Sequence, residues 1–229
     1  MIDFTATPAV TSPEVAASPR PRRRGTGALL AAGVVAGPLY VGVSLTQALT
    51  RPGFDLSRHP WSALANGDLG WLQVVNLILT GALVIAFSSG LRRVLTTGRA
   101  STWAPRLIGV YGASLIGAGL FRADPVPGFP AGTPAGTTIS WHGIAHLMVG
   151  AVGFGCLTAA CLLLARRLAG TERGWAVWTA AAGITFLGAF VGIASGAGTP
   201  VTIQAFVLAV IIIWTWFSTY AAHLIRAGR

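Results

Sequence analysis

The sequence predicts an all-α protein, a six-transmembrane-helix bundle with a short surface helix in the first outer loop. Three observations lead to this fold class. Hydrophobic residues make up 53% of the 229 residues and charged residues only 10%, against roughly 25% charged residues in a typical soluble domain. The mean hydropathy is +0.68. Six apolar runs approach the length of about 20 residues that a helix needs to cross a membrane.

The six apolar runs alternate with polar segments that hold most of the charge. The third run is the shortest, because Pro105 and Arg106 leave only residues 107–121 uninterrupted. We retain it because omitting it would place the charged loops on its two sides on the same face of the membrane. The predicted helices are 27–49, 71–90, 103–121, 142–165, 175–196 and 201–224.

The segment before the first run is rich in Pro, Ala, Ser and Thr. It contains too little apolar surface to fold, so we expect a disordered cytoplasmic tail at 1–26. A six-helix membrane domain at 27–225 and a cytoplasmic C-terminus at 226–229 would follow. The competing interpretation is a cleaved signal peptide, but the first run of about 23 residues exceeds the 7 to 15 that such signals usually have.

The arginines predict the orientation, because all 16 basic residues are Arg. With the N-terminus inside, thirteen lie in cytoplasmic segments, and only Arg51, Arg58 and Arg122 lie outside, as the positive-inside rule requires. We therefore expect a multi-pass protein of the cell membrane with both termini cytoplasmic. This topology and contact with anionic membrane lipids account for the net charge of +10, so no nucleic-acid partner is needed.

Glycines four residues apart predict close contacts between helices. Gly33 and Gly37 form such a face in the first helix, and Gly188, Gly192 and Gly196 form one in the fifth. We favour packing within one chain, with a homo-oligomer through the same faces as the alternative.

The first outer loop contains a second, shorter helical pattern. Pro60 fits the first turn of a helix through residue 65, and this piece would lie on the membrane surface with Trp61 and Leu64 dipping in. Asp68 is then expected to cap the second long helix.

Ionisable residues gather in the two long outer loops. Three of the six carboxylates and three of the four histidines lie in residues 51–68 and 122–146. An ionisable group at the edge of the hydrocarbon layer is costly, and it is a functional candidate for that reason. The candidate binding residues are Arg51, Asp55, Ser57, Arg58, His59, Arg122 and Asp124.

The histidine pair predicts the most specific chemistry. His142 and His146 are four residues apart, which places both imidazoles on one face of the fourth helix. Such a pair can bind zinc with a third ligand from the loops, here His59, Asp124 or Asp55, and with a position open to water. The alternative is structural, because histidines at a helix start also bind loop carbonyls or Asp124.

Three classes of function follow from these patterns. The first is a metal-dependent membrane hydrolase that cleaves lipid-like esters or amides. The second is a non-catalytic lipid-binding or scaffold protein, in which Arg51, Arg58 and Arg122 hold a headgroup. An ion-coupled transporter is disfavoured, because no ionisable residue lies near the middle of a predicted helix. Whether the protein is an enzyme stays open.

Several of these motifs together resemble a known family. They are residues 51–71, the segment Phe121-Arg-Ala-Asp-Pro125, the segment Gly128-Phe-Pro130 and the segment His142-Gly-Ile-Ala-His146. They resemble the bacterial and archaeal integral membrane proteins catalogued as domain of unknown function 998. The resemblance covers roughly residues 27 to 225. It implies a six-helix membrane fold and no activity, and no catalytic residue is carried over.

Overall fold

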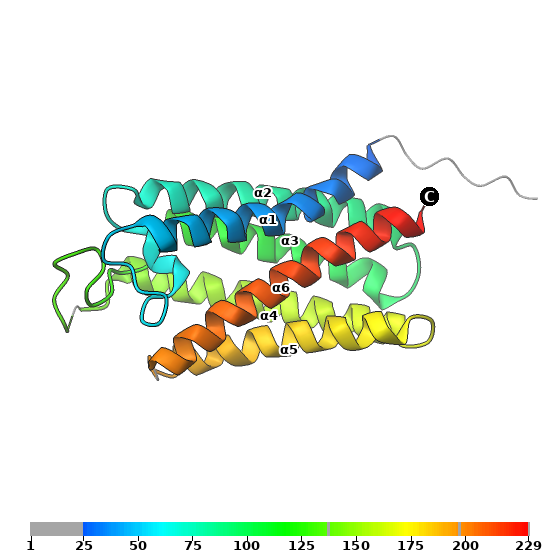
Figure 1. Cartoon of the computed structure of the whole chain (residues 1–229). Coiled ribbons are helices and arrows are strands. Elements are labelled where there is room, and N and C mark those ends of the chain that lie inside the picture. The colour runs from blue at the N-terminus through cyan, green and yellow to red at the C-terminus, as the bar shows by residue number, and fades with distance from the viewer. Residues whose placement is uncertain (1–24, 137, 197, 229) are drawn as a thin grey trace, which may run out of the picture.

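The computed structural model describes residues 25–136, 138–196 and 198–228. The regular structure of these residues is helical throughout, with six long α-helices and one short 3-10 helix (Figure 1). Of the tail predicted at 1–26, residues 1–24 lie outside the described residues. The elements are α1 (Thr26–Thr50), η1 (Trp61–Ala65), α2 (Gly70–Val94), α3 (Arg99–Leu120), α4 (Trp141–Leu168), α5 (Arg173–Ala194) and α6 (Pro200–Ala227).

Each predicted apolar run coincides with one α-helix, and the ends differ by at most four residues. Five of the helices, α1, α2, α4, α5 and α6, are long and apolar enough to cross a membrane. The helix α3 falls short of the same criterion, and it contains Arg99, Pro105 and Arg106 in its first two turns. The chain is therefore an all-helical, multi-pass membrane protein.

The six α-helices form a closed ring. Each packs on its neighbour in sequence, and α6 returns to pack on α1. The helices run side by side, so that both long loops lie at one end and the two ends of the helical domain at the other (Figure 1). Since each helix packs mainly on two neighbours, the ring encloses an interior that side chains must fill.

Glycines bring the helices of the ring close together. A Cβ atom at Gly33 would lie within 3 Å of the Phe87 ring on α2, and one at Gly37 would clash with Ser218 and the Trp214 backbone on α6. The packing predicted for this face of α1 is confirmed. Three further helix contacts depend on glycine in the same way, at Gly81 between α2 and α3, Gly153 between α3 and α4, and Gly183 between α4 and α5.

The prediction that another helix of the chain packs on the glycine face of α5 is wrong. A Cβ atom at Gly188, Gly192 or Gly196 would have no neighbour within 4 Å in the described structure. Gly196 lies beyond the end of α5, where its φ of 83° is one that glycine adopts without strain. Ring stacking between Phe186 and Phe206 joins α5 to α6 on a different face. Homo-oligomerisation through the glycine face stays a prediction.

Buried polar side chains join α1 to α2 in the halves next to the loop that connects them. The Gln47 amide donates to Gln73 Oε1 at 3.0 Å, and Gln73 Nε2 donates to Ser44 Oγ at 3.1 Å. Asn76 Nδ2 donates to the Tyr40 carbonyl at 3.2 Å. These polar groups therefore satisfy one another, as helix contacts inside a membrane require, except for the buried Gln47 Oε1, which has no partner among the described residues.

The short helix predicted at 60–65 is present as η1, but its apolar side chains have a different environment from the expected one. Trp61 is 3% exposed and Leu64 is fully buried within the protein. The assignment of Asp68 as a cap is wrong, because Leu69 takes the N-cap position of α2 without a side-chain hydrogen bond. The Asp68 carboxylate comes one residue too early to cap, since α2 begins only at Gly70.

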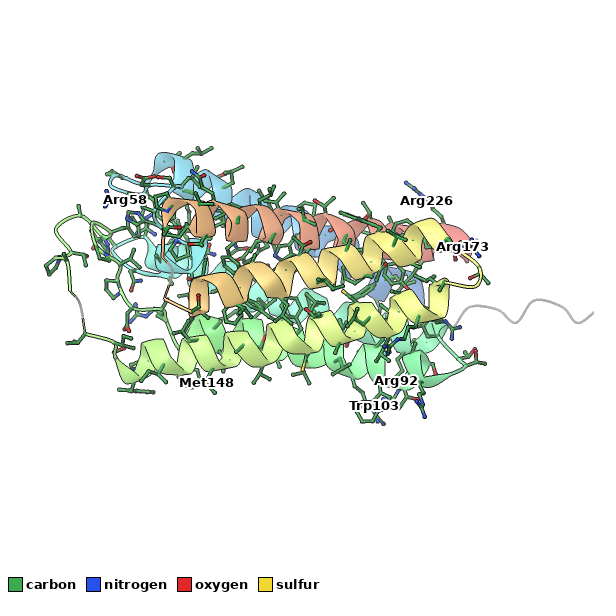
Figure 2. All side chains as sticks on the ribbon, turned by 90° about the horizontal axis from the view of Figure 1, so that it is seen from below. Arg58, Arg92, Trp103, Met148, Arg173 and Arg226 are labelled. Carbon is green, nitrogen blue, oxygen red and sulfur yellow. The ribbon has the colours of Figure 1, made fainter. Side chains whose placement is uncertain are left out.

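The two ends of the ring differ in charge. Arg92, Arg173 and Arg226 lie at the end where α1 begins and α6 finishes, whereas Arg58 lies at the opposite end with the long loops (Figure 2). We call the end with the long loops the loop end.

Candidate functional site

Arg51 binds the two long loops together at the loop end. Its guanidinium donates to the main-chain carbonyls of Leu64 and Asn66 and lies 4.8 Å from the centre of the Phe129 ring. The Asn66 amide then donates to the Ala123 carbonyl of the second loop at 3.0 Å. Arg51 is thus engaged by the protein, which leaves it little capacity to hold a lipid headgroup.

His59 forms a second link between the loops. Its Nδ1 accepts the Asp55 backbone N–H at 3.0 Å, so the ring proton of the neutral imidazole is on Nε2. Nε2 donates that proton to the Pro127 carbonyl at 3.1 Å. The ring is 4% exposed and packs beside Phe54 and Phe129. Both nitrogens are occupied, so in this conformation His59 has no lone pair to offer a metal.

Asp55 and Ser57 form a local turn. The Asp55 carboxylate accepts from the Ser57 backbone N–H at 2.8 Å and from the Ser57 hydroxyl at 2.7 Å. These hydrogen bonds, with the charge of nearby Arg58 as a smaller contribution, lower the pKa of Asp55. The turn is therefore stabilised at pH values above the unfolded pKa of the carboxyl, and that stability is lost as the pH falls through the lower folded pKa.

Asp124 holds the start of α4. Its two carboxylate oxygens accept from the backbone N–H of Ser140, at 2.9 Å, and from the Ser140 hydroxyl. Ser140 in turn caps α4 by accepting from the Gly143 N–H at 3.1 Å. A Cβ atom at Gly143 would clash with the Asp124 carboxylate, so this glycine makes room for it. Arg122, two residues before Asp124, is exposed.

The two histidines of α4 have separate environments. His142 is exposed, and its ring lies 3.5 Å from the ring of Trp141, centre to centre. His146 is half-buried, and its Nδ1 lies 2.8 Å from the Phe121 carbonyl and 3.1 Å from the Ala118 carbonyl. Within the described part of the chain, no three His, Cys, Asp or Glu side chains gather closely enough to hold a metal. The residues proposed as zinc ligands thus lie at different positions around the loop end.

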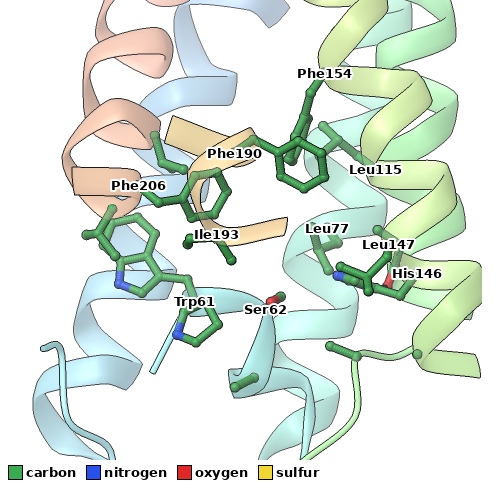
Figure 3. A pocket seen from close by; sticks show the side chains of 18 of the residues that line it. Trp61, Ser62, Leu77, Leu115, His146, Leu147, Phe154, Phe190, Ile193 and Phe206 are labelled. Atoms are coloured by element: carbon green, nitrogen blue, oxygen red, sulfur yellow. Dashed lines mark hydrogen bonds between the residues drawn. The ribbon is translucent and has the colours of Figure 1, made fainter. Parts of the chain in front are cut away.

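A large apolar cavity lies inside the ring, beneath the loops. Its volume is about 330 Å³. Aromatic side chains from the middle of five helices meet at its inner end, with Tyr40 and Trp214 stacked at 5.1 Å and Phe154 4.6 Å from Phe186. From there it extends outward past Phe190 and Phe206 to η1 and the second loop (Figure 3).

Few of the predicted site residues contribute to this cavity. Asp124 and His146 line it, whereas His142 and the three outer arginines do not. The aromatic lining could not be identified from sequence, because an apolar phenylalanine in a membrane helix is compatible with facing either lipid or protein. One signal was present in Trp214, whose position deep in the sixth helix is unusual for an interfacial tryptophan. It lines the cavity, whereas Trp216 is buried and donates to Thr179 Oγ1 at 2.9 Å.

Comparison with known proteins identifies one similarity. A family model described as "Protein of unknown function (DUF998)" matches residues 34–223. No curated protein and no solved structure matches the chain. The matched segment contains both long loops, the helices α2 to α5 in full, and α1 and α6 without the first turns of α1 and the end of α6. It therefore includes the residues that line the cavity.

Proposed function

The chain belongs to the DUF998 family, whose description assigns no activity, and we propose from its geometry that it is a lipid-binding membrane protein. The apolar part of a lipid-like molecule would occupy the cavity, and its polar end would lie at the loop end. The observation that carries this proposal is the apolar cavity of about 330 Å³ inside the ring, a size within the range of about 300 to 1,000 Å³ typical of small-molecule sites.

The nature of the lining supports an apolar ligand. Side chains such as Leu115, Phe190 and Phe206 surround most of the cavity, and its carboxylate and imidazole, from Asp124 and His146, lie toward the loops. Filling such a space with a hydrocarbon chain removes apolar surface from water on both partners, at roughly 25 cal/mol for each Å².

Exposed side chains in the cavity wall support entry from the membrane. Ile139 is 70% exposed and Leu147 is 46% exposed, and both line the cavity at the outer end of α4. Apolar side chains that line a cavity and are also exposed mark its opening. In the proposed topology this opening faces the outer part of the hydrocarbon layer, so an amphipathic molecule would enter sideways.

The proposed topology has six spans in the cell membrane. The helix α3 packs between α2 and α4 in the ring, which supports its role as the sixth span although its own composition is less apolar. The arginine-rich end would be cytoplasmic and the loop end outside. The short helix η1 would then lie at the outer membrane surface, covered by the loops.

The experiment fills the cavity at a position that tolerates a side chain. Gly150 is buried in the cavity wall, yet a Cβ atom there would meet no atom within 4 Å. We expect Gly150→Leu to occupy the cavity and to weaken saturable binding of radiolabelled dodecan-1-ol to the purified protein at least about tenfold, the effect of roughly 1.4 kcal/mol of lost binding free energy. Equilibrium dialysis against empty detergent micelles measures the affinity.

The matched control is Gly155→Leu on the same helix. Gly155 also has free space around its Cβ position, but it does not line the cavity. This variant should bind dodecan-1-ol like the unsubstituted protein. Equal affinities for the two leucine variants would contradict the proposal.

A further inference from the structure

We propose that His146 selects the ligand of this cavity by accepting a hydrogen bond from a hydroxyl group at its polar end. The inference rests on the proposed function, because it concerns the chemistry of the molecule bound there. It identifies the ligand class as a neutral amphiphile with a hydrogen-bond donor, such as a long-chain alcohol, in preference to an anionic lipid.

The neighbours of His146 determine which of its nitrogens carries the proton. Both partners of Nδ1, the carbonyls of Ala118 and Phe121, can only accept hydrogen bonds. They belong to the last turn of α3 and to its C-cap residue, where main-chain carbonyls have no partner within the helix. Nδ1 must therefore be the donor. In the neutral ring Nε2 then has a free lone pair and acts as an acceptor.

The free acceptor belongs to a residue of the cavity wall. His146 lines the cavity, and its ring projects from α4 toward the interior beside Leu147 (Figure 3). In the described part of the chain, the hydrogen bonds of the His146 ring are both made by Nδ1, and Nε2 makes none. An apolar ligand without a donor would cover this nitrogen and leave it unpaired, which is unfavourable. A hydroxyl group would satisfy it.

The carboxylate in the lining also favours a ligand with a hydrogen-bond donor. The Asp124 carboxylate, which lines the cavity, can only accept hydrogen bonds when ionised. No arginine lines the cavity. A carboxylate or phosphate on the ligand would therefore meet a like charge, with no arginine in the lining to compensate.

The test compares three probes that share one alkyl chain. They are dodecan-1-ol, its methyl ether, which has no hydrogen-bond donor, and dodecanoate, which is anionic. The purified full-length protein should bind the alcohol about tenfold more tightly than the ether, which is the effect of one well-formed hydrogen bond. It should bind dodecanoate more weakly than the alcohol.

Two substitutions separate the two nitrogens of His146. In His146→Asn, the amide nitrogen replaces Nδ1 and can still donate to the α3 carbonyls, but the Nε2 acceptor is lost. We expect this variant to bind the alcohol and the ether equally, with the ether affinity unchanged. His146→Gln instead places an acceptor near the Nε2 position and should restore part of the preference. His142→Asn is the control, because His142 is exposed and does not line the cavity.

Equal binding of alcohol and ether by the unsubstituted protein would overturn the inference, and so would an unchanged preference in His146→Asn. In both cases the cavity would still bind the probes, and Gly150→Leu would still weaken their binding. Failure of all three probes to bind saturably would remove the proposed function together with this inference. Gel filtration checks that each variant is folded. If His146→Asn aggregates, His146→Gln alone is the test, and equal binding of the alcohol and the ether by that variant would overturn the inference.

Discussion

The three histidines at the loop end show how the partners of a residue decide its chemistry. His59 has both nitrogens bound by main-chain groups of the two loops. His142 stacks on Trp141 and is exposed. Only His146 combines a fixed proton on one nitrogen with a free acceptor on the other. Imidazole has a donor and an acceptor in its neutral form, so the atoms around each ring select which of them remains available.

At the same scale, Arg51 is predicted to hold the loops together through the shape of its guanidinium. Its fork reaches two carbonyls while its plane covers the Phe129 ring, which the ammonium of lysine cannot do at once. We expect Arg51→Lys to lower the stability by about 1.5 to 3 kcal/mol, the contribution of one hydrogen bond to a charged group. The midpoint of thermal unfolding in detergent measures the change.

The control for Arg51 is the same substitution at a neighbouring arginine. Arg58 is exposed in the first loop, and only its backbone N–H makes a hydrogen bond within the described residues, to the Asp55 carbonyl. Arg58→Lys should leave the unfolding midpoint within error of the unsubstituted protein. If both substitutions lowered the midpoint equally, the role of Arg51 would be one of charge alone.

At the scale of single helices, the spacing of glycines did not distinguish a packing face from an open one. The face with Gly33 and Gly37 on α1 is filled by α2 and α6, whereas the face with Gly188 and Gly192 on α5 has no neighbour. The two patterns have the same period. What differs is the position of the adjacent helices, and this depends on how the whole ring closes.

The helix α1 allows a direct test of this distinction. Gly37→Ala would drive a methyl group into Ser218 and the Trp214 backbone, and because overpacking costs about 1 to 3 kcal/mol, the stability should fall by that amount. Gly42→Ala on the same helix has open space around its Cβ position. It should leave the thermal unfolding midpoint unchanged or raise it slightly, since alanine favours helix. Equal effects would exclude close packing of α1 on α6 as the cause.

At the scale of the whole molecule, the separation of arginines predicts the orientation in the membrane. Arg92, Arg173 and Arg226 lie at the end opposite the long loops (Figure 2), and the positive-inside rule places that end in the cytoplasm. In a variant without Cys156 and Cys161, a cysteine at Ala135 should react with a membrane-impermeant maleimide added to intact cells. A cysteine at Thr96 should react only after lysis. The reverse pattern would show the opposite orientation.

The site was predictable in part, and the missing part has a physical cause. Sequence reasoning selected His146 and Asp124, which line the cavity, because ionisable residues beside apolar runs are rare and easily recognised. It grouped them with Arg51, His59 and His142, which the structure places outside the cavity. Sharing a loop or a helix face does not bring side chains together, since the loops fold back on their own main chain and satisfy those residues locally.

The sequence by itself determined the membrane class, the number of long helices and their approximate ends. These depend on the length and apolarity of each segment, which are local properties. The closed ring, the cavity within it and the free acceptor on His146 were decided only by tertiary structure. Each arises where segments distant in the chain meet, as when α6 returns to α1 or when the last carbonyls of α3 take the proton of a histidine on α4.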